Sequence, residues 1–156
     1  MLYCQGYTVS FQEVPDEVSL VFLVGDCPYR CPGCHSPDMQ KAEGNDLESS
    51  LINVFQQYAD TVTCVCFMGA GQDEEALLRC ANIVKLFSLK TALYTGAEDV
   101  PDEYLDTFDY IKTGPYIEKL GGLSTPGTNQ HMYRIVHHGL RTVKEDITKS
   151  FQKEKT

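Results

Sequence analysis

The segment VSLVFLVGDCPYRCPGCH, residues 18–35, organises the interpretation of the whole chain. Residues 18–24 are a nearly continuous apolar run, which is typical of a strand buried on both faces of a parallel sheet. Three cysteines follow at C-x3-C-x2-C spacing: Cys27, Cys31 and Cys34. Since ligands of α/β proteins bind beyond the carboxyl ends of their strands, this cysteine loop is the first candidate for a site.

Six segments after the cysteine loop alternate between helical and strand-like patterns. They are a helix at 47–58, a strand at 62–68, a helix at 72–88, a strand at 91–95, a helix at 102–107 and a strand at 110–112. Together with the strand at 18–24, this order predicts an α/β fold in which parallel strands are joined by helical crossovers. A complete eight-fold β/α barrel takes about 250 residues. Because the chain has 156 residues, we expect an open, partial β/α barrel.

The last third of the chain has a different pattern. Residues 115–131 are rich in Gly, Pro, Thr and Asn, which predicts a loop. Residues 132–137 and 140–147 predict a β-hairpin that turns at Gly139. The charged tail from Lys149 is expected to fray. Since no repeat, low-complexity tract or linker interrupts residues 1–156, we interpret the chain as a single domain.

Composition restricts the possible classes of function. The net charge is −9, and no run of Lys and Arg offers the basic footprint that phosphate binding needs, so nucleic acid is not an expected partner. Seven cysteines, an odd number at short spacings, do not resemble a secreted disulfide framework. The sequence has no signal-peptide pattern and no apolar run of about 18 residues. We therefore expect a cytoplasmic protein with no membrane partner.

The loops after the predicted strands are expected to share one edge of the sheet. These are the cysteine loop, residues 69–73 after the second strand, residues 94–96 after the third and residues 113–116 after the fourth. The carboxyl ends of parallel strands lie at the same edge, so the four loops are predicted to form one site.

The number of cysteines distinguishes two kinds of metal centre. Three thiolates hold three irons of a four-iron cluster and leave the fourth iron open, whereas a structural zinc ion needs four ligands. His35 is the nearest fourth ligand for zinc, but its adjacency to Cys34 makes joint ligation of one ion awkward. Cys64 and Cys66 are two residues apart on a predicted strand and therefore face the same side. Either they assist a metal, or, as we favour, they are small buried residues.

These motifs resemble those of a known family. The C-x3-C-x2-C motif at the end of a first strand is the cluster motif of the radical S-adenosylmethionine (SAM) enzymes. Within that superfamily, GYTVSF at 6–11, CHSP at 34–37 and TNQ at 128–130 resemble the anaerobic ribonucleotide reductase activating enzymes. The resemblance covers most of residues 6–135.

The resemblance implies a mechanism. Cys27, Cys31 and Cys34 would ligate a [4Fe-4S] cluster, and the amino and carboxylate groups of SAM would chelate its fourth iron. An external one-electron donor, flavodoxin-like or ferredoxin-like, would drive reductive cleavage of SAM. The radical so formed would take a hydrogen from a glycine of the partner, a glycyl radical enzyme subunit of the anaerobic ribonucleotide reductase. No side-chain acid, base or nucleophile is required, so no catalytic residue is expected beyond the cluster and SAM.

Strand-end residues are the candidates for contact with the cofactors: Tyr29, Gly33, His35, Gly69, Ala70, Gly71, Asp73, Tyr94, Thr95 and Thr113. In the family, the loop after the second strand commonly ends in an acidic residue that contacts the SAM amino group. Gly71 stands there in this chain, and nearby Asp73 is the remaining carboxylate. Asn129, Gln130 and Tyr133 either line a groove for the partner or satisfy main-chain groups of the loop.

Two other interpretations stay open at this point. The nearest is an activase for a different glycyl radical enzyme, or another small radical SAM enzyme. The other belongs to a different class, a non-catalytic module that binds an iron–sulfur cluster or zinc through the same cysteines.

Overall fold

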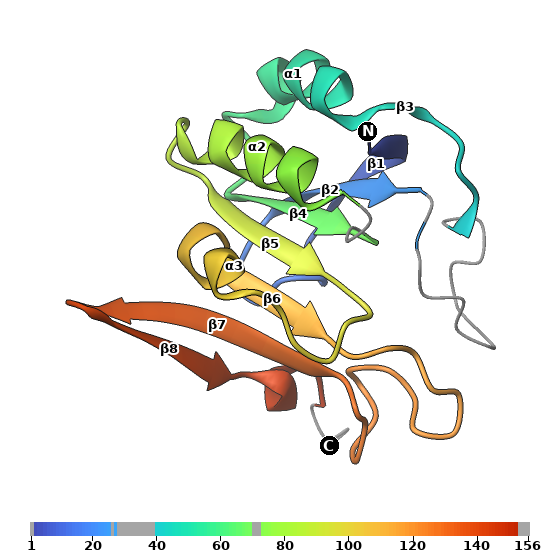
Figure 1. The fold of residues 1–156 in the computed structure, drawn as a ribbon, viewed down its shortest axis with the longest axis vertical. Helices are drawn as coiled ribbons and strands as arrows, with labels where there is room; N and C mark the ends of the chain where they lie inside the picture. Colours follow the sequence, from blue (N-terminus) through green and yellow to red (C-terminus); the bar gives the residue numbers. More distant parts are fainter. Residues whose placement is uncertain (1, 26, 28–39, 70–72, 153–156) are drawn as a thin grey trace.

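A computed structural model describes residues 2–25, 27, 40–69 and 73–152 of the chain. Within them, the strands form one eight-stranded sheet in the order β3-β1-β2-β4-β5-β6-β7-β8 (Figure 1). The strands are β1 (Tyr3–Ser10), β2 (Ser19–Val24), β3 (Asn45–Asp46), β4 (Cys64–Met68), β5 (Lys90–Tyr94), β6 (Tyr110–Thr113), β7 (His131–His138) and β8 (Arg141–Asp146). The helices are α1 (Leu47–Tyr58), α2 (Glu74–Lys85), α3 (Asp102–Thr107) and a 3-10 helix at Thr148–Phe151. The chain is therefore a mixed α/β structure, as its sequence predicts.

The centre of the sheet is parallel. Strand β2 pairs with β4, β4 with β5 and β5 with β6, all in parallel. One helix follows each of β2, β4 and β5 before the chain returns to the next strand. This is the predicted β-α-β-α-β-α-β order, and α1 and α3 have the predicted bounds. Helix α1 begins where expected because Asp46 caps it, its carboxylate accepting from the Ser49 amide at 3.1 Å.

The two flanks of the sheet are antiparallel. Strand β1 pairs antiparallel with both β2 and β3, while β7 pairs antiparallel with β6 and β8. The predicted hairpin is confirmed, and Gly139 turns it with a φ of +60°. Sequence patterning missed β1, because its register shifts between Cys4 and Gly6 and the period-2 alternation is broken there. Because of these flanks the sheet is mixed, not parallel throughout.

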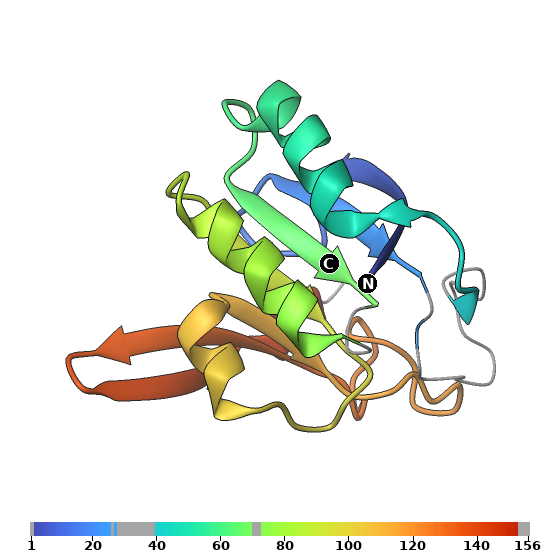
Figure 2. The same ribbon diagram turned by 45° about the horizontal axis from the view of Figure 1, so that its top comes forward.

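All three α-helices cover the same face of the sheet, as Figure 2 shows. The core on that face joins strand residues such as Phe22, Phe67 and Leu93 to helix residues such as Leu51 and Leu77, all fully or almost fully buried. The rings of Phe22 and Phe67 stack with their centroids 6.1 Å apart. This core fixes the crossovers against β2, β4 and β5.

Loops and chain ends cover the opposite face. Its buried core contains Val21, Cys66, Tyr110 and Met132 from the strands, with Val14 from the segment between β1 and β2. Leu123, Ile147 and Phe151 pack against this core. None of its members comes from α1, α2 or α3 among the described residues. This face, called the helix-free face because none of α1, α2 and α3 covers it, is closed by loops and by the 3-10 helix at Thr148–Phe151, and it is where the cavity lies.

The end of the described chain differs from the sequence expectation. Fraying was expected from Lys149, but Thr148–Phe151 forms a 3-10 helix. Thr148 is buried, and its hydroxyl accepts from the Met132 amide at 3.0 Å, which ties this helix to β7. A further finding concerns the helices: in the described ranges none has the length and apolar character needed to cross a bilayer.

Replacement of Phe67 by Ala should destabilise the protein strongly. Phe67 is fully buried at the centre of the sheet, and removal of a buried aromatic ring costs about 3–5 kcal/mol. Phe11→Ala is the matched control, because Phe11 is 73% exposed and surface substitutions stay within about 0.5 kcal/mol. Denaturant unfolding measures both free energies. Equal losses for the two variants would contradict this packing.

Candidate functional site

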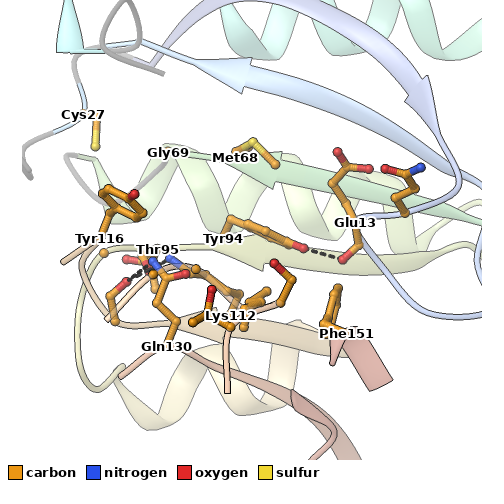
Figure 3. Close-up of a pocket in the computed structure, with 18 of the residues that line it drawn as sticks. Glu13, Cys27, Met68, Gly69, Tyr94, Thr95, Lys112, Tyr116, Gln130 and Phe151 are labelled. Atoms are coloured by element: carbon orange, nitrogen blue, oxygen red, sulfur yellow. Dashed lines mark hydrogen bonds between the residues drawn. The ribbon is translucent and has the colours of Figure 1, made fainter. Parts of the chain in front are cut away.

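A cavity of about 790 Å³ lies at the carboxyl ends of the parallel strands, on the helix-free face (Figure 3). Its lining includes Met68, Tyr94 and Lys112 from the ends of β4, β5 and β6, and the residues that directly follow these strands: Gly69, Thr95 and Gly114. Other segments complete the lining with Gln12, Glu13, Cys27, Gln40, Gly96, Tyr116, Gly121, Gly122, Leu123, Ser124, Thr125, Gln130 and Phe151. Residues from all four of the loops that were predicted to form one site therefore line a single cavity.

A row of side chains forms the wall of the cavity across three strands. Met68 is in register with Tyr94, and Tyr94 is in register with Lys112. Because side chains alternate along a strand, the neighbouring residues point to the helix face instead. Leu93 and Ile111 accordingly belong to the helix-side core. The cavity wall is therefore set by the sheet register.

Lys112 holds the ends of two strands together beneath the cavity. It is only 9% exposed, and its ammonium donates to the main-chain carbonyls of Gly114 at 2.8 Å and Thr95 at 3.3 Å. Gln130 donates to the same Gly114 carbonyl at 3.3 Å. A buried ammonium requires such acceptors, since the transfer of a charge out of water is otherwise strongly unfavourable. Sequence reasoning missed Lys112, although the alternation from Tyr110 places it on the cavity face.

Tyr94 anchors the segment that closes one end of the cavity. Its hydroxyl donates to the main-chain carbonyl of Glu13, as the dashed line in Figure 3 marks. Burial raises the pKa of Tyr94 well above its usual value, and the nearby Cys66 and Glu13 act in the same direction. The hydroxyl therefore keeps its proton and its bond to the 11–17 segment. In Figure 3, Glu13 and Phe151 lie at the end of the cavity opposite Cys27 and Tyr116.

The long loop between β6 and β7 forms another wall. The Asn129 amide donates to the Pro115 carbonyl at 2.9 Å, and the Thr128 hydroxyl donates to the Gly121 carbonyl at 3.0 Å. Gln152, at the chain's C-terminal side, donates to the carbonyls of Leu123 at 3.1 Å and Thr125 at 3.3 Å. Asn129 and Gln130 therefore satisfy main-chain groups of this loop, and Gln130 also lines the cavity.

The structure brings four of the predicted site residues together: Cys27, Gly69, Tyr94 and Thr95 all line the cavity. Asp73 instead caps α2, where its carboxylate accepts from the Ala76 amide at 3.2 Å. Thr113 is 5% exposed and is not among the lining residues, because its neighbour Lys112 takes the cavity face. The other predicted positions lie outside the described residues: Tyr29, Cys31, Gly33, Cys34, His35, Ala70 and Gly71.

Four further cysteines are buried: Cys4, Cys64, Cys66 and Cys80. Cys64 and Cys66 face the same side, away from the helices, while Val65 faces the helices, as expected. Burial raises the pKa of Cys64 and of Cys80 to about 12, and raises that of Cys66 well above its usual value. These thiols are therefore neutral core groups. Within the described ranges, no three His, Cys, Asp or Glu side chains are grouped so that they would hold a metal ion.

Comparisons with protein-family models, curated proteins and solved structures gave no match. The geometry of the cavity and the residues of the chain are accordingly the basis for its functional interpretation.

Gly114→Ala should distort the cavity floor, whereas Gly122→Ala should be tolerated. Gly114 has a φ of +100°, and a Cβ there would lie 2.9 Å from the main-chain oxygen of Asn129. Gly122 lines the same cavity, but a Cβ there would meet Gln130 Oε1 at an ordinary 3.6 Å. We expect a loss of at least about 1 kcal/mol in unfolding free energy for Gly114→Ala alone. Similar unfolding free energies for both variants would refute this conformational requirement.

Cys64 and Cys66 should resist alkylation by iodoacetamide at about pH 8 in the folded protein. The thiolate is the reacting species, and both side chains are fully buried with raised pKa values. Peptide mapping by mass spectrometry should show their modification only after unfolding in denaturant. Rapid modification of either thiol under native conditions would contradict their assignment to the core.

Proposed function

We propose that this chain is a radical SAM activase, which cleaves SAM reductively at a [4Fe-4S] cluster and generates a glycyl radical on an anaerobic ribonucleotide reductase. The observation that carries the proposal is that Cys27 lines the same strand-end cavity as Gly69 and Thr95. The sequence predicts that the cysteine loop and the other strand-end loops form one site. The presence of Cys27 on the same cavity as residues of those loops supports a shared site.

The size and shape of the cavity suit a small-molecule cofactor. Its volume of about 790 Å³ lies within the range of about 300–1,000 Å³ found for ligand pockets. Five glycines line it: Gly69, Gly96, Gly114, Gly121 and Gly122. Glycine lets a ligand approach the main chain closely, because no Cβ intervenes.

The topology supports a partial barrel of the β/α type. Strands β2, β4, β5 and β6 lie side by side in chain order, and their helical connections share one face. A doubly wound sheet instead reverses its strand order and carries helices on both faces. We therefore interpret the parallel part of the sheet as a section of a β/α barrel, flanked by antiparallel strands. Its concave interior would be the helix-free face.

The residues present fit the proposed cofactors. Cys27 would supply one thiolate toward the cavity, with Cys31 and Cys34, outside the described residues, supplying the others. When bound, the cluster and SAM supply the one-electron chemistry that generates the radical. The chain supplies position: Lys112 fixes the carbonyls of Thr95 and Gly114 in the cavity floor.

Exclusion of water is the second task of the chain's own residues. The 11–17 segment is tied to β5 through Tyr94, and the Gly121–Thr125 loop is tied to the C-terminal end through Gln152. The contact of Tyr94 with Glu13 closes the end of the cavity opposite Cys27, and the Gln152 contacts hold another part of its lining in place. Such enclosure protects a reactive intermediate from side reactions.

The proposed partners follow from the same chemistry. A cytoplasmic one-electron donor, flavodoxin-like or ferredoxin-like, would reduce the centre. The proposed substrate is a protein, the glycyl radical subunit, as the resemblance to the activating enzymes implies. Such a subunit would complete the open side of the partial barrel.

The test is anaerobic reconstitution with iron and sulfide, followed by SAM and dithionite. The wild-type protein should bind iron and release 5′-deoxyadenosine, and Cys27→Ala should lose most of both. Cys80→Ala is the matched control, because Cys80 is buried in the helix-side core. A colourless protein that holds one zinc ion and does not cleave SAM would contradict the proposal and favour the non-catalytic module.

A second measurement distinguishes between possible protein partners. The reconstituted activase is mixed with a candidate anaerobic ribonucleotide reductase, and glycyl radical formation is followed by electron paramagnetic resonance. A glycyl doublet that requires SAM is expected. SAM cleavage without any doublet on this reductase would instead indicate another glycyl radical enzyme as the partner.

A further inference from the structure

The β7–β8 hairpin ends the sheet with an exposed strand. Strand β6 pairs with β7 up to Arg134, the Ile135 amide donates to the Asp109 carbonyl just before β6, and β7 from Val136 onward is paired with β8. In Figures 1 and 2 the hairpin extends beyond the neighbouring strands. All six residues of β8 are exposed, and β8 is the last strand in the sheet order among the described residues. An edge strand of this kind presents main-chain groups that another strand can pair with.

One side of β8 has an apolar centre between opposite charges. Val143 pairs with Val136, while Glu145 pairs with Arg134 on β7. Arg141, Val143 and Glu145 alternate along the strand and therefore share one face. Val143 is 39% exposed. The pattern read along this face is positive, apolar, negative.

This pattern is complementary to itself when reversed. If two β8 strands pair antiparallel about Val143, each Arg141 stands opposite the Glu145 of the other copy. Thr142 then stands opposite Lys144 on the other face, so no two like charges are directly opposed. Opposite charges at directly facing positions stabilise an antiparallel pair, and like charges destabilise it.

We propose that β8 pairs with β8 of a second copy of this chain, forming a symmetric dimer with one continuous sheet. The two-fold axis passes through the facing Val143 residues, and two Arg141–Glu145 pairs flank it. A two-fold interface brings the same surface of both copies together, so that surface must be complementary to itself. Glu145 would lie between Arg141 of the second copy and Arg134 of its own chain, whose Nη1 is 4.0 Å from Glu145 Oε2.

Charged edge strands often prevent association. The segment that contains β8, however, differs in net charge from the chain as a whole. The chain carries a net charge of −9, whereas residues 131–149 contain four Lys and Arg against two Asp and Glu. The segment that contains this edge therefore carries a net positive charge, although the chain as a whole is acidic. One strand pair buries little surface, so the dimer should be weak and depend on concentration.

The dimer would leave the strand-end cavity accessible. Arg141, Val143 and Glu145 are not among the cavity-lining residues. The inference is thus independent of the proposed activity, and its test uses the protein without reconstitution, with oligomeric state as the readout.

Sedimentation velocity over about 1–200 μM protein tests the proposal, with circular dichroism as the check of folding. The wild type should shift from monomer to dimer across this range. Arg141→Glu and Glu145→Arg should each weaken dimerisation about tenfold or more, because each places like charges opposite one another. The double variant Arg141→Glu/Glu145→Arg restores opposite charges and should restore the dimer. Lys119→Glu, an exposed position outside the hairpin, is the matched control for added negative charge and should dimerise like the wild type.

Three results would overturn the proposal. They are a wild type that remains monomeric at the highest concentration, a dimer insensitive to both single reversals, and a folded double variant that fails to recover association.

Discussion

The position of all three helical crossovers on one face of the parallel strands is the constraint on which the structure depends. Because of this position, the helices pack on one face of β2, β4, β5 and β6. The opposite face of these strands is covered by segments outside the three α-helices. The loops that close it come from distant parts of the chain, before β2, after β6 and after β8. Because parallel strands end together, the same constraint gathers their carboxyl ends around one cavity.

Lys112 stabilises the ends of β5 and β6 at the cavity floor, where main-chain carbonyls are buried and need hydrogen-bond donors. Its buried ammonium bonds the carbonyls that follow β5 and β6, and the Gln130 side chain bonds one of the same carbonyls. Strand ends that would otherwise leave main-chain acceptors without donors are thereby satisfied inside the protein. The cavity floor is consequently held in place by hydrogen bonds.

Local signals made the central elements predictable. Helix α1 was predicted with its observed bounds because its apolar period is clear and Asp46 supplies the cap. Strand β1 was not predicted, because the register shift after Cys4 breaks its alternation. The 3-10 helix at Thr148–Phe151 depends on bonds to β7 and was also missed, since such long-range contacts leave no pattern in the local sequence.

The candidate site, like the fold, was predictable only where local sequence signals place a residue at the end of a strand. Strand-end logic selected Gly69, Tyr94 and Thr95, which line the cavity. On β6 it selected Thr113 instead of Lys112, because a one-residue change along a strand reverses the face. Glu13 and Phe151 come from segments whose approach to the cavity is tertiary.

The central proposal is that the cysteine loop would hold a [4Fe-4S] cluster and leave one iron of it for SAM to bind. The most direct measurement is the electron paramagnetic resonance spectrum of the reconstituted, reduced protein with and without SAM. The account predicts that SAM changes the g-values of the cluster signal, since its amino and carboxylate groups would bind the iron that lacks a protein ligand. A cluster signal that is unchanged at saturating SAM would contradict it.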